Sequence, residues 1–338
     1  MTQRIAYIDA LRGYVMLLVV LGHVPMYSYH ATGMFSFSLI PPTFHLALFF
    51  FISGWFVKDN GRSLWTMVKE KFVQLIIPTA IFYLLYCWLN HIDIVDNLWH
   101  DKYKAGYWFC IVLFCFFLLA KLFFLLTARW KSHVGGVILA SAVCLVALML
   151  NTNGATNLLS TYHIPNILCL QQWQYFVFFC LGALAHRHQD RFFRMLDNQY
   201  IMGAGIAIFL LSFMVCYQQS VGLWGIKAEF LLWGLLGAVV SFAFFRKYEE
   251  AFHQNTLIGK SLQYIGRRTL DVYLLHFFFL PSNLQIVGAF FKDNSNPTIE
   301  LFMSLAISLM TVALCLLTSN IIRLSPLLAH WVLGVKSK

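Results

Sequence analysis

Charged residues are scarce in this chain of 338 residues. Asp, Glu, Lys and Arg together make up 11% of it, whereas a soluble globular protein carries about 25%. Hydrophobic residues make up 60% of the chain and aromatic residues 17%. A soluble core of this size has no use for so much apolar surface. The composition therefore excludes a soluble enzyme and predicts an all-α protein that crosses a membrane many times.

Cysteine motifs, leader features and linkers are also missing. The eight cysteines form no Cys-x-x-Cys pair and no Cys/His cluster with zinc spacing, so neither a disulfide framework nor a metal is predicted. The first apolar run is too long for the core of a cleavable leader and lacks a small-residue cleavage site, so we expect it to be retained as the first span. Without Ser-, Pro- or Gly-rich linkers, residues 1–338 are expected to form a single domain.

Long apolar runs are what the chain has instead. Hydropathy predicts about ten transmembrane helices, near Leu11–Tyr29, Pro42–Val57, Phe72–Leu89, Tyr107–Leu126, Val134–Leu150, Trp173–Ala185, Ile201–Tyr217, Trp224–Phe245, Leu270–Phe291 and Ile299–Ile322. No internal repeat stands out, which weighs against transporter folds built from inverted repeats.

The positive charge is distributed unevenly between the two sets of loops. Of the 24 Lys and Arg residues, 19 fall on the side of the N-terminus, four fall on the opposite side and Lys121 lies within the fourth run. Cytoplasmic loops carry such an excess, so both termini are predicted to be cytoplasmic. The net charge of +10 then reflects topology, and no nucleic-acid partner is predicted.

Two ionisable residues lie inside the first run. Arg12 and His23 are eleven residues apart, which places both on one face of a helix and separates them by roughly 16 Å along its axis. Ionisable groups inside a bilayer are costly and by default mark a functional path. The structural alternatives are that Arg12 extends to the headgroups and that His23 hydrogen-bonds a neighbouring helix.

These residues carry a family resemblance. Asp9-x-x-Arg12-Gly13 followed by His23, the segment Phe44-His45 to Ser53-Gly54, and Gly266 to His276 with Leu270, Tyr273 and Leu274 resemble the motifs of the acyltransferase-3 family of integral-membrane acyltransferases. The resemblance implies transfer of an acyl group, usually acetyl, from cytoplasmic acetyl-CoA to a hydroxyl of an extracytoplasmic carbohydrate. It also implies a location in the cell (inner or cytoplasmic) membrane.

Acyl transfer needs a base, and histidine has a suitable pKa for that role near neutral pH. We expect His23 to be the base, Arg12 to bind the pantetheine or phosphate end of the donor, and Asp9 to orient Arg12. His45 starts the second helix at a similar depth and could meet His23 in one pocket. A covalent acyl-histidine intermediate is chemically possible as well.

Further cations could hold the phosphates of coenzyme A. The candidates are Lys69, Lys71, Arg267 and Arg268, and His276 could line the donor's path; each could equally serve topology or packing. The family has a second arginine where this chain has Gln74, so the donor contact at Lys71 is incomplete. Asp271 and His276, five residues apart, do not share a helix face well.

An alternative function and the identity of the acceptor stay open. Buried His, Asp and Glu are also what proton relays use, so a proton-coupled transporter is the alternative function. The acceptor is not readable: a surface polysaccharide, a lipid-linked glycan, a peptidoglycan sugar and a small hydroxylated product are all compatible with the sequence.

Overall fold

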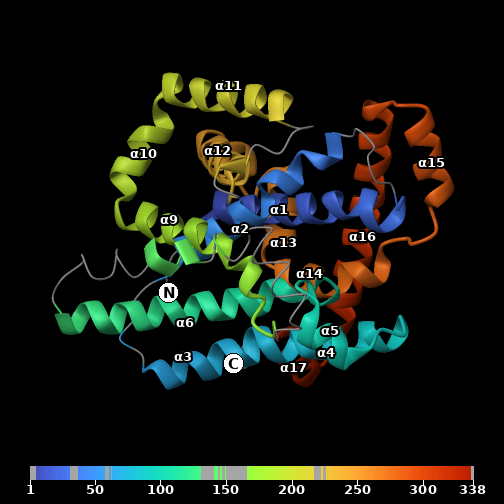
Figure 1. Cartoon of the computed structure of the whole chain (residues 1–338), viewed down its shortest axis with the longest axis horizontal. Helices are drawn as coiled ribbons and strands as arrows, with labels where there is room; N and C mark the ends of the chain where they lie inside the picture. Colours follow the sequence, from blue (N-terminus) through green and yellow to red (C-terminus); the bar gives the residue numbers. More distant parts are fainter. Residues whose placement is uncertain are drawn as a thin grey trace. The chain divides into compact units, whose positions relative to one another are not determined.

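Helices make up nearly all of the described part of the computed structural model (Figure 1). The described residues are 5–30, 37–57, 61, 63–130, 141–143, 145–146, 149, 166–216, 222–223 and 226–335. A short antiparallel pair, Gly222–Leu223 (β1) with Ile226–Lys227 (β2), is the exception within them. Contacts divide the chain into two units, which are described separately. Unit 1 comprises Met1–Phe49, Gln189–Gln219 and Glu229–Ile322; unit 2 comprises Phe50–His188, Ser220–Ala228 and Arg323–Lys338.

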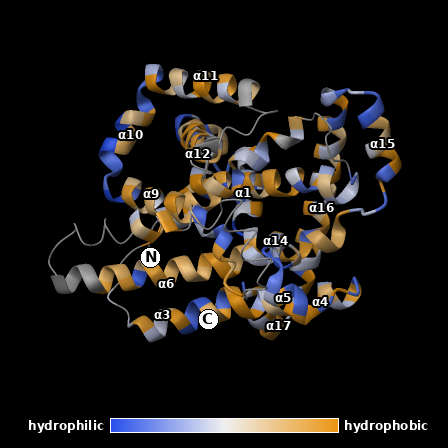
Figure 2. Cartoon of the chain, viewed as in Figure 1, coloured by the Kyte–Doolittle hydropathy of each residue, from blue (hydrophilic) through white to orange (hydrophobic). Residues whose placement is uncertain are grey.

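Five helical stretches in the described residues are long and apolar enough to cross a membrane. They are Ala6–Ser28, Leu64–Leu89, Trp108–Leu125, Phe230–Lys247 and Pro297–Ile322. Helices α10 (Gln189–Asp197) and α11 (Gln199–Cys216) would make a sixth if they count as one span, although they are bent by 76° (Figure 1). Apolar residues dominate most helices, while α10 mixes hydrophilic and hydrophobic residues (Figure 2). A helical membrane protein is thus confirmed, whereas ten spans and cytoplasmic termini stay predictions.

Several predicted spans differ from the structure. The ninth run, Leu270–Phe291, is not one continuous helix. It forms two helices, α14 (Thr269–Phe279) and α15 (Gln285–Asp293), separated around Pro281, which cannot donate a backbone hydrogen bond. The second and sixth runs form the short helices α2 (His45–Trp55) and α9 (Phe176–Arg187). At 1.5 Å per residue, each rises less than about 20 Å. Most of the fifth run lies outside the described residues.

Helix α1 (Ala6–His23) is the central element of unit 1. It continues as a π-helical turn, η1 (Val24–Ser28), and 72% of the most apolar window of this span is buried. A helix that is apolar on all sides belongs inside a bundle, which is where α1 lies. The change to π geometry coincides with Pro25, which lacks the N–H of a regular turn. His23 therefore sits immediately before a change in helix geometry.

Glycines allow α13 (Leu257–Gly266) to pack against α1 backbone to backbone. A Cβ at Gly266 would lie 1.8 Å from the Asp9 carbonyl oxygen, and a Cβ at Gly13 would lie 2.0 Å from that of Leu262. Only glycine fits at such a distance. This contact fixes the residues that follow Gly266 beside the first turns of α1.

Helix α1 contacts α13, α14, α16 and the short turns η2 (Phe37–Leu39), η3 (Pro41–Thr43) and η7 (Glu249–Phe252). The longest helix of unit 1 is α16 (Pro297–Ile322). The unit also contains the start of α2 and the helices α10, α11, α12 (Ala228–Lys247) and α15.

Unit 2 is held together by aromatic side chains and a second pair of glycines. Phe116 packs against Phe50, Phe176 and Phe179, with ring centroids 4.9 to 5.6 Å apart. A Cβ at Gly54 would lie 1.9 Å from the Phe179 carbonyl oxygen, so α2 and α9 touch closely. The helical elements of this unit are the rest of α2, α3 (Leu64–Lys71), η4 (Phe72–Ile76), α4 (Ile77–Leu89), α5 (Ile94–His100), η5 (Lys104–Gly106), α6 (Trp108–Trp130), η6 (Leu170–Tyr175), α9 and α17 (Pro326–Leu333).

Candidate functional site

Arg12 is tied to the start of α14. Its Nη2 donates to Thr269 Oγ1 at 3.2 Å, and its Nη1 lies 3.9 Å from Asp9 Oδ1. Asp9 in the first turn also interacts favourably with the positive end of the helix dipole. Asp9 lies beside Arg12, as expected. That Asp9 orients Arg12 for donor binding stays a prediction. The Arg12 side chain is 35% exposed, so it can still meet a ligand.

His23 pairs with His276 of α14. His23 Nδ1 lies 3.1 Å from His276 Nε2, and the two rings are nearly parallel with centroids 5.1 Å apart. Phe277 and Tyr27 pack against His23, with ring centroids 5.2 and 5.3 Å from it. His276 is completely buried, whereas His23 is half-buried. The imidazole that can meet a substrate is therefore His23, and His276 stands behind it.

The other hydrogen bonds of His276 determine which histidine donates in the His23–His276 hydrogen bond. Its Nδ1 lies 2.7 Å from the Tyr273 carbonyl oxygen and 3.2 Å from that of Val272. A carbonyl can only accept, so Nδ1 carries the proton and Nε2 of the neutral ring accepts. His23 Nδ1 must then donate to His276. In the neutral tautomer assigned from this network, the lone pair of His23 is on Nε2, where a base needs it.

His45 belongs to the same unit and lies within electrostatic range of His23. It is buried, and its Nδ1 donates to the Pro41 carbonyl oxygen at 2.7 Å. The lone pair of the neutral ring is then on Nε2. The direct hydrogen bond of His23 is with His276, and His45 is close by, so one pocket shared by His23 and His45 stays a prediction.

The predicted donor cations fall in different places. Arg267 is exposed and its Nε donates to the Gln263 carbonyl oxygen at 3.1 Å, while the Arg268 guanidinium stacks 4.0 Å from the centre of the Tyr264 ring. Both follow Gly266 and lie at the Arg12 end of unit 1. Lys69 and Lys71 are residues of unit 2, where Lys71 Nζ lies over Phe117. A joint site of these lysines with Arg12 stays a prediction.

Sequence reasoning missed a buried carboxylate in α16. Glu300 Oε1 accepts from Ser38 Oγ at 2.8 Å and from Ser304 Oγ at 2.6 Å, and the Tyr29 hydroxyl lies 3.3 Å from Ser304 Oγ. Glu300 is 1% exposed. The sequence could have predicted this site, because Glu300 lies at the start of the tenth apolar run and acidic residues in such runs mark functional or paired groups.

Asp271 has a partner other than His276. Ser319 Oγ donates to Asp271 Oδ2 at 2.5 Å, and both residues are buried. That Asp271 and His276 do not act as a dyad stays a prediction. Among the residues that the structure describes, no group of three or more His, Cys, Asp and Glu side chains could hold a metal ion.

Comparison with known protein families gives a match that covers most of the chain. A family model described as an acyltransferase domain covers residues 5–320 of the chain. No curated protein and no solved structure matches. The match runs from the start of α1 to within two residues of the end of α16, so the histidine pair and the Arg12 contacts lie inside the matched region.

Proposed function

Because the chain belongs to the acyltransferase-3 family, we propose that this membrane acyltransferase moves an acetyl group from acetyl-CoA to a hydroxyl of a carbohydrate outside the cytoplasm. The observation that carries the proposal is the His23–His276 hydrogen bond, which leaves Nε2 of His23 as an available base. Family membership also favours this reaction over a proton-coupled transporter.

The proposed reaction uses His23 Nε2 to take the proton of the acceptor hydroxyl. The hydroxyl oxygen attacks the thioester carbonyl carbon, and the tetrahedral intermediate collapses to an ester while the carbon–sulfur bond breaks. The thiolate of coenzyme A leaves and receives the same proton from His23. His276 accepts from Nδ1 of His23 throughout, which orients the ring and disperses the transient positive charge, as the third member of a catalytic triad does.

In this proposal Arg12 binds the acyl donor and takes no part in the proton transfer by His23. It lies on the same face of α1, roughly 16 Å along the helix from His23. A guanidinium recognises phosphate strongly, and coenzyme A carries its phosphates far from its sulfur. Helix α1 thus contacts α14 at two places, at Arg12 through Thr269 and at His23 through His276, and a long donor could lie along this helix pair.

The test is transfer from radiolabelled acetyl-CoA in membranes containing the wild-type protein, His23→Ala or Arg12→Ala at equal abundance. We expect label in a base-labile ester of a glycan fraction, lost with His23→Ala and reduced with Arg12→Ala. His188→Ala, an exposed histidine of unit 2, is the matched control and should transfer normally. Normal turnover by His23→Ala would refute the assignment of the base. Label trapped on the protein in rapidly quenched wild type would indicate an acyl-histidine intermediate instead of direct transfer.

A further inference from the structure

Two aromatic rings lie beside the imidazole of His23. Tyr27 follows it by four residues, in the π-helical turn η1, and the two rings stand edge-to-face with their centres 5.3 Å apart. The ring centre of Phe277 in α14 lies 5.2 Å from that of His23 and 4.0 Å from that of His276. All four residues belong to unit 1. The rings of Tyr27 and Phe277 therefore occupy space directly next to the proposed base.

These two rings also pack on each other. Their centres are 5.2 Å apart and their planes cross at 63°, which is an edge-to-face contact. Phe277 is only 7% exposed, whereas Tyr27 is half-buried. Closely packed rings change position only at a cost, so they give the adjacent space a defined size. We call Tyr27 and Phe277 the aromatic pair.

The proposed position of the donor directs its acyl end toward the aromatic pair. Helices α1 and α14 run in the same direction, because Arg12 contacts Thr269 near their starts and His23 contacts His276 further along both. A donor that lies from Arg12 to His23 carries its acyl group at the His23 end. Beyond the histidines, α1 continues to Tyr27 and α14 to Phe277.

The reaction geometry brings the acyl chain within reach of these rings. A base takes a hydroxyl proton at about 2.6–3.2 Å, and the attacked carbon lies about 3–3.5 Å from the hydroxyl oxygen. The acyl carbonyl carbon is then within about 7 Å of His23 Nε2. The aromatic pair lies in the same range from the His23 ring. A chain that extends from this carbon past the histidines meets the two rings.

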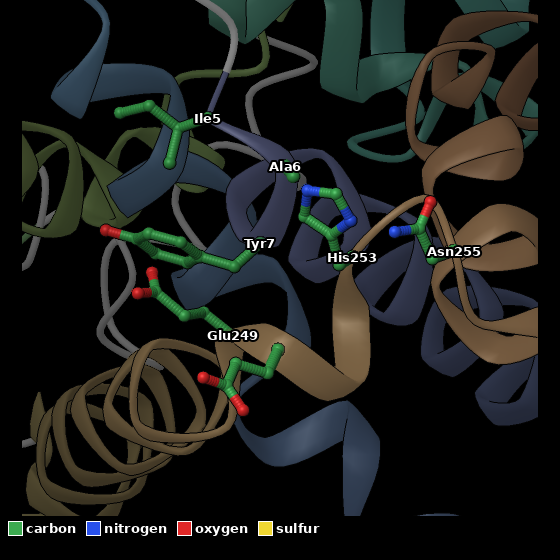
Figure 3. A pocket seen from close by; sticks show the side chains of 7 residues that line it. Ile5, Ala6, Tyr7, Glu249, His253 and Asn255 are labelled. Carbon is green, nitrogen blue, oxygen red and sulfur yellow. The ribbon is translucent and has the colours of Figure 1, made fainter.

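The pocket at the start of α1 is too distant to hold the acyl group (Figure 3). Tyr7 and Glu249 are among its lining residues. Tyr7 and His23 are sixteen residues apart on α1, or about 24 Å at 1.5 Å per residue. The group on which His23 acts must therefore bind elsewhere, beside the imidazole itself.

We infer that the aromatic pair of Tyr27 and Phe277 bounds the site of the transferred acyl group and restricts it to short chains. This inference rests on the proposed function. An acetyl group presents only a methyl group to the rings, whereas the two further methylenes of a butyryl group must displace one ring. A single methylene changes kcat/KM by about 10- to 200-fold in a fitted apolar site.

The test measures kcat/KM for acetyl-CoA and butyryl-CoA with one glycan fraction as acceptor, in wild type, Phe277→Ala and Tyr27→Ala. In wild type, the value for butyryl-CoA should be lower by about 100-fold or more. Removal of either ring opens space beside His23 and should raise the butyryl-to-acetyl ratio by about tenfold or more. The readout is a ratio within each variant, so a general loss of activity cancels.

Phe279→Ala is the matched control. Phe279 is a half-buried ring of the same helix, and two residues of about 100° each place it on the side opposite Phe277. Its ratio should equal that of wild type. If Phe277→Ala fails to fold, Phe277→Leu carries the measurement, because leucine keeps an apolar side chain but removes the ring.

Two results would overturn the inference: a wild type that transfers butyryl as well as acetyl, or a wild-type ratio in both ring variants. Transfer by wild type with an unchanged ratio in the variants leaves the proposed function standing. If wild type transfers from neither donor, the proposed function fails and the inference fails with it.

Discussion

Replacing Gly266 by alanine should separate α13 from α1 and thereby disable the site. The added Cβ would lie 1.8 Å from the Asp9 carbonyl oxygen, whereas ordinary van der Waals contact begins near 3.4 Å. The atom in the way is backbone, so one helix must move by about 1.6 Å. Overpacking of this kind lowers the free energy of unfolding by typically about 1–3 kcal/mol.

The same movement should lower activity. Thr269 follows Gly266 by three residues and accepts a 3.2 Å hydrogen bond from Arg12, which a shift of this size stretches beyond hydrogen-bond range. A misplacement of about 1 Å can cost roughly 100-fold in rate. We therefore expect Gly266→Ala to unfold at lower temperature in detergent and to lose about 10- to 100-fold in kcat/KM.

Gly203→Ala is the matched control. Gly203 lies in α11 of the same unit, and a Cβ there would meet nothing within 4 Å. Alanine is the better helix former by roughly 0.5–1 kcal/mol, so this variant should be as stable as wild type or more so. If Gly266→Ala matched Gly203→Ala in both melting temperature and turnover, the packing argument would be refuted.

Three further predictions concern other buried groups. His276→Gln keeps an acceptor for His23 Nδ1 and should retain more activity than His276→Phe, which we expect to lower kcat about 100-fold; equal rates for the two would contradict a positioning role. Glu300→Ala removes the carboxylate that accepts from two buried hydroxyls and should lower the free energy of unfolding by about 2 kcal/mol more than Glu300→Gln, as chemical denaturation in detergent would show. Burial raises the pKa of the Cys169 thiol to about 12, so only about one part in 10⁴ is thiolate at pH 8. Mass spectrometry should find Cys169 unalkylated by maleimide in the folded protein and alkylated after unfolding; labelling of the folded protein would reject this burial.

Helical periodicity predicted the arrangement of α1 well. Arg12 and His23 were expected on one face, and both contact α14, through Thr269 and His276. These two partners are seven residues apart and so share a face of their own helix as well. Which residues share a helix face depends only on their spacing in the sequence, so it can be predicted without knowing the tertiary structure.

The choice of neighbours could not be predicted in the same way. Consecutive spans usually pack together, so His45 was a candidate neighbour of His23, and it is close by; the hydrogen bond to His276, 253 residues away, was not predicted. That contact follows from backbone packing at Gly13 and Gly266, and the glycines alone do not say which helix they meet. Pro281 was different: it stood in the ninth run and could have predicted the break after α14.

The short length of α14 has a consequence for how water reaches the protein. Its eleven residues rise about 16 Å, roughly half of a 30 Å hydrocarbon layer, and residues 280–284 after it are not helical. Ser282 and Asn283 in this stretch are exposed. Irregular backbone at membrane depth is tolerated only inside protein or against water. Water in contact with Ser282 and Asn283 would let a hydrophilic acceptor approach this stretch from the aqueous phase without dissolving in lipid.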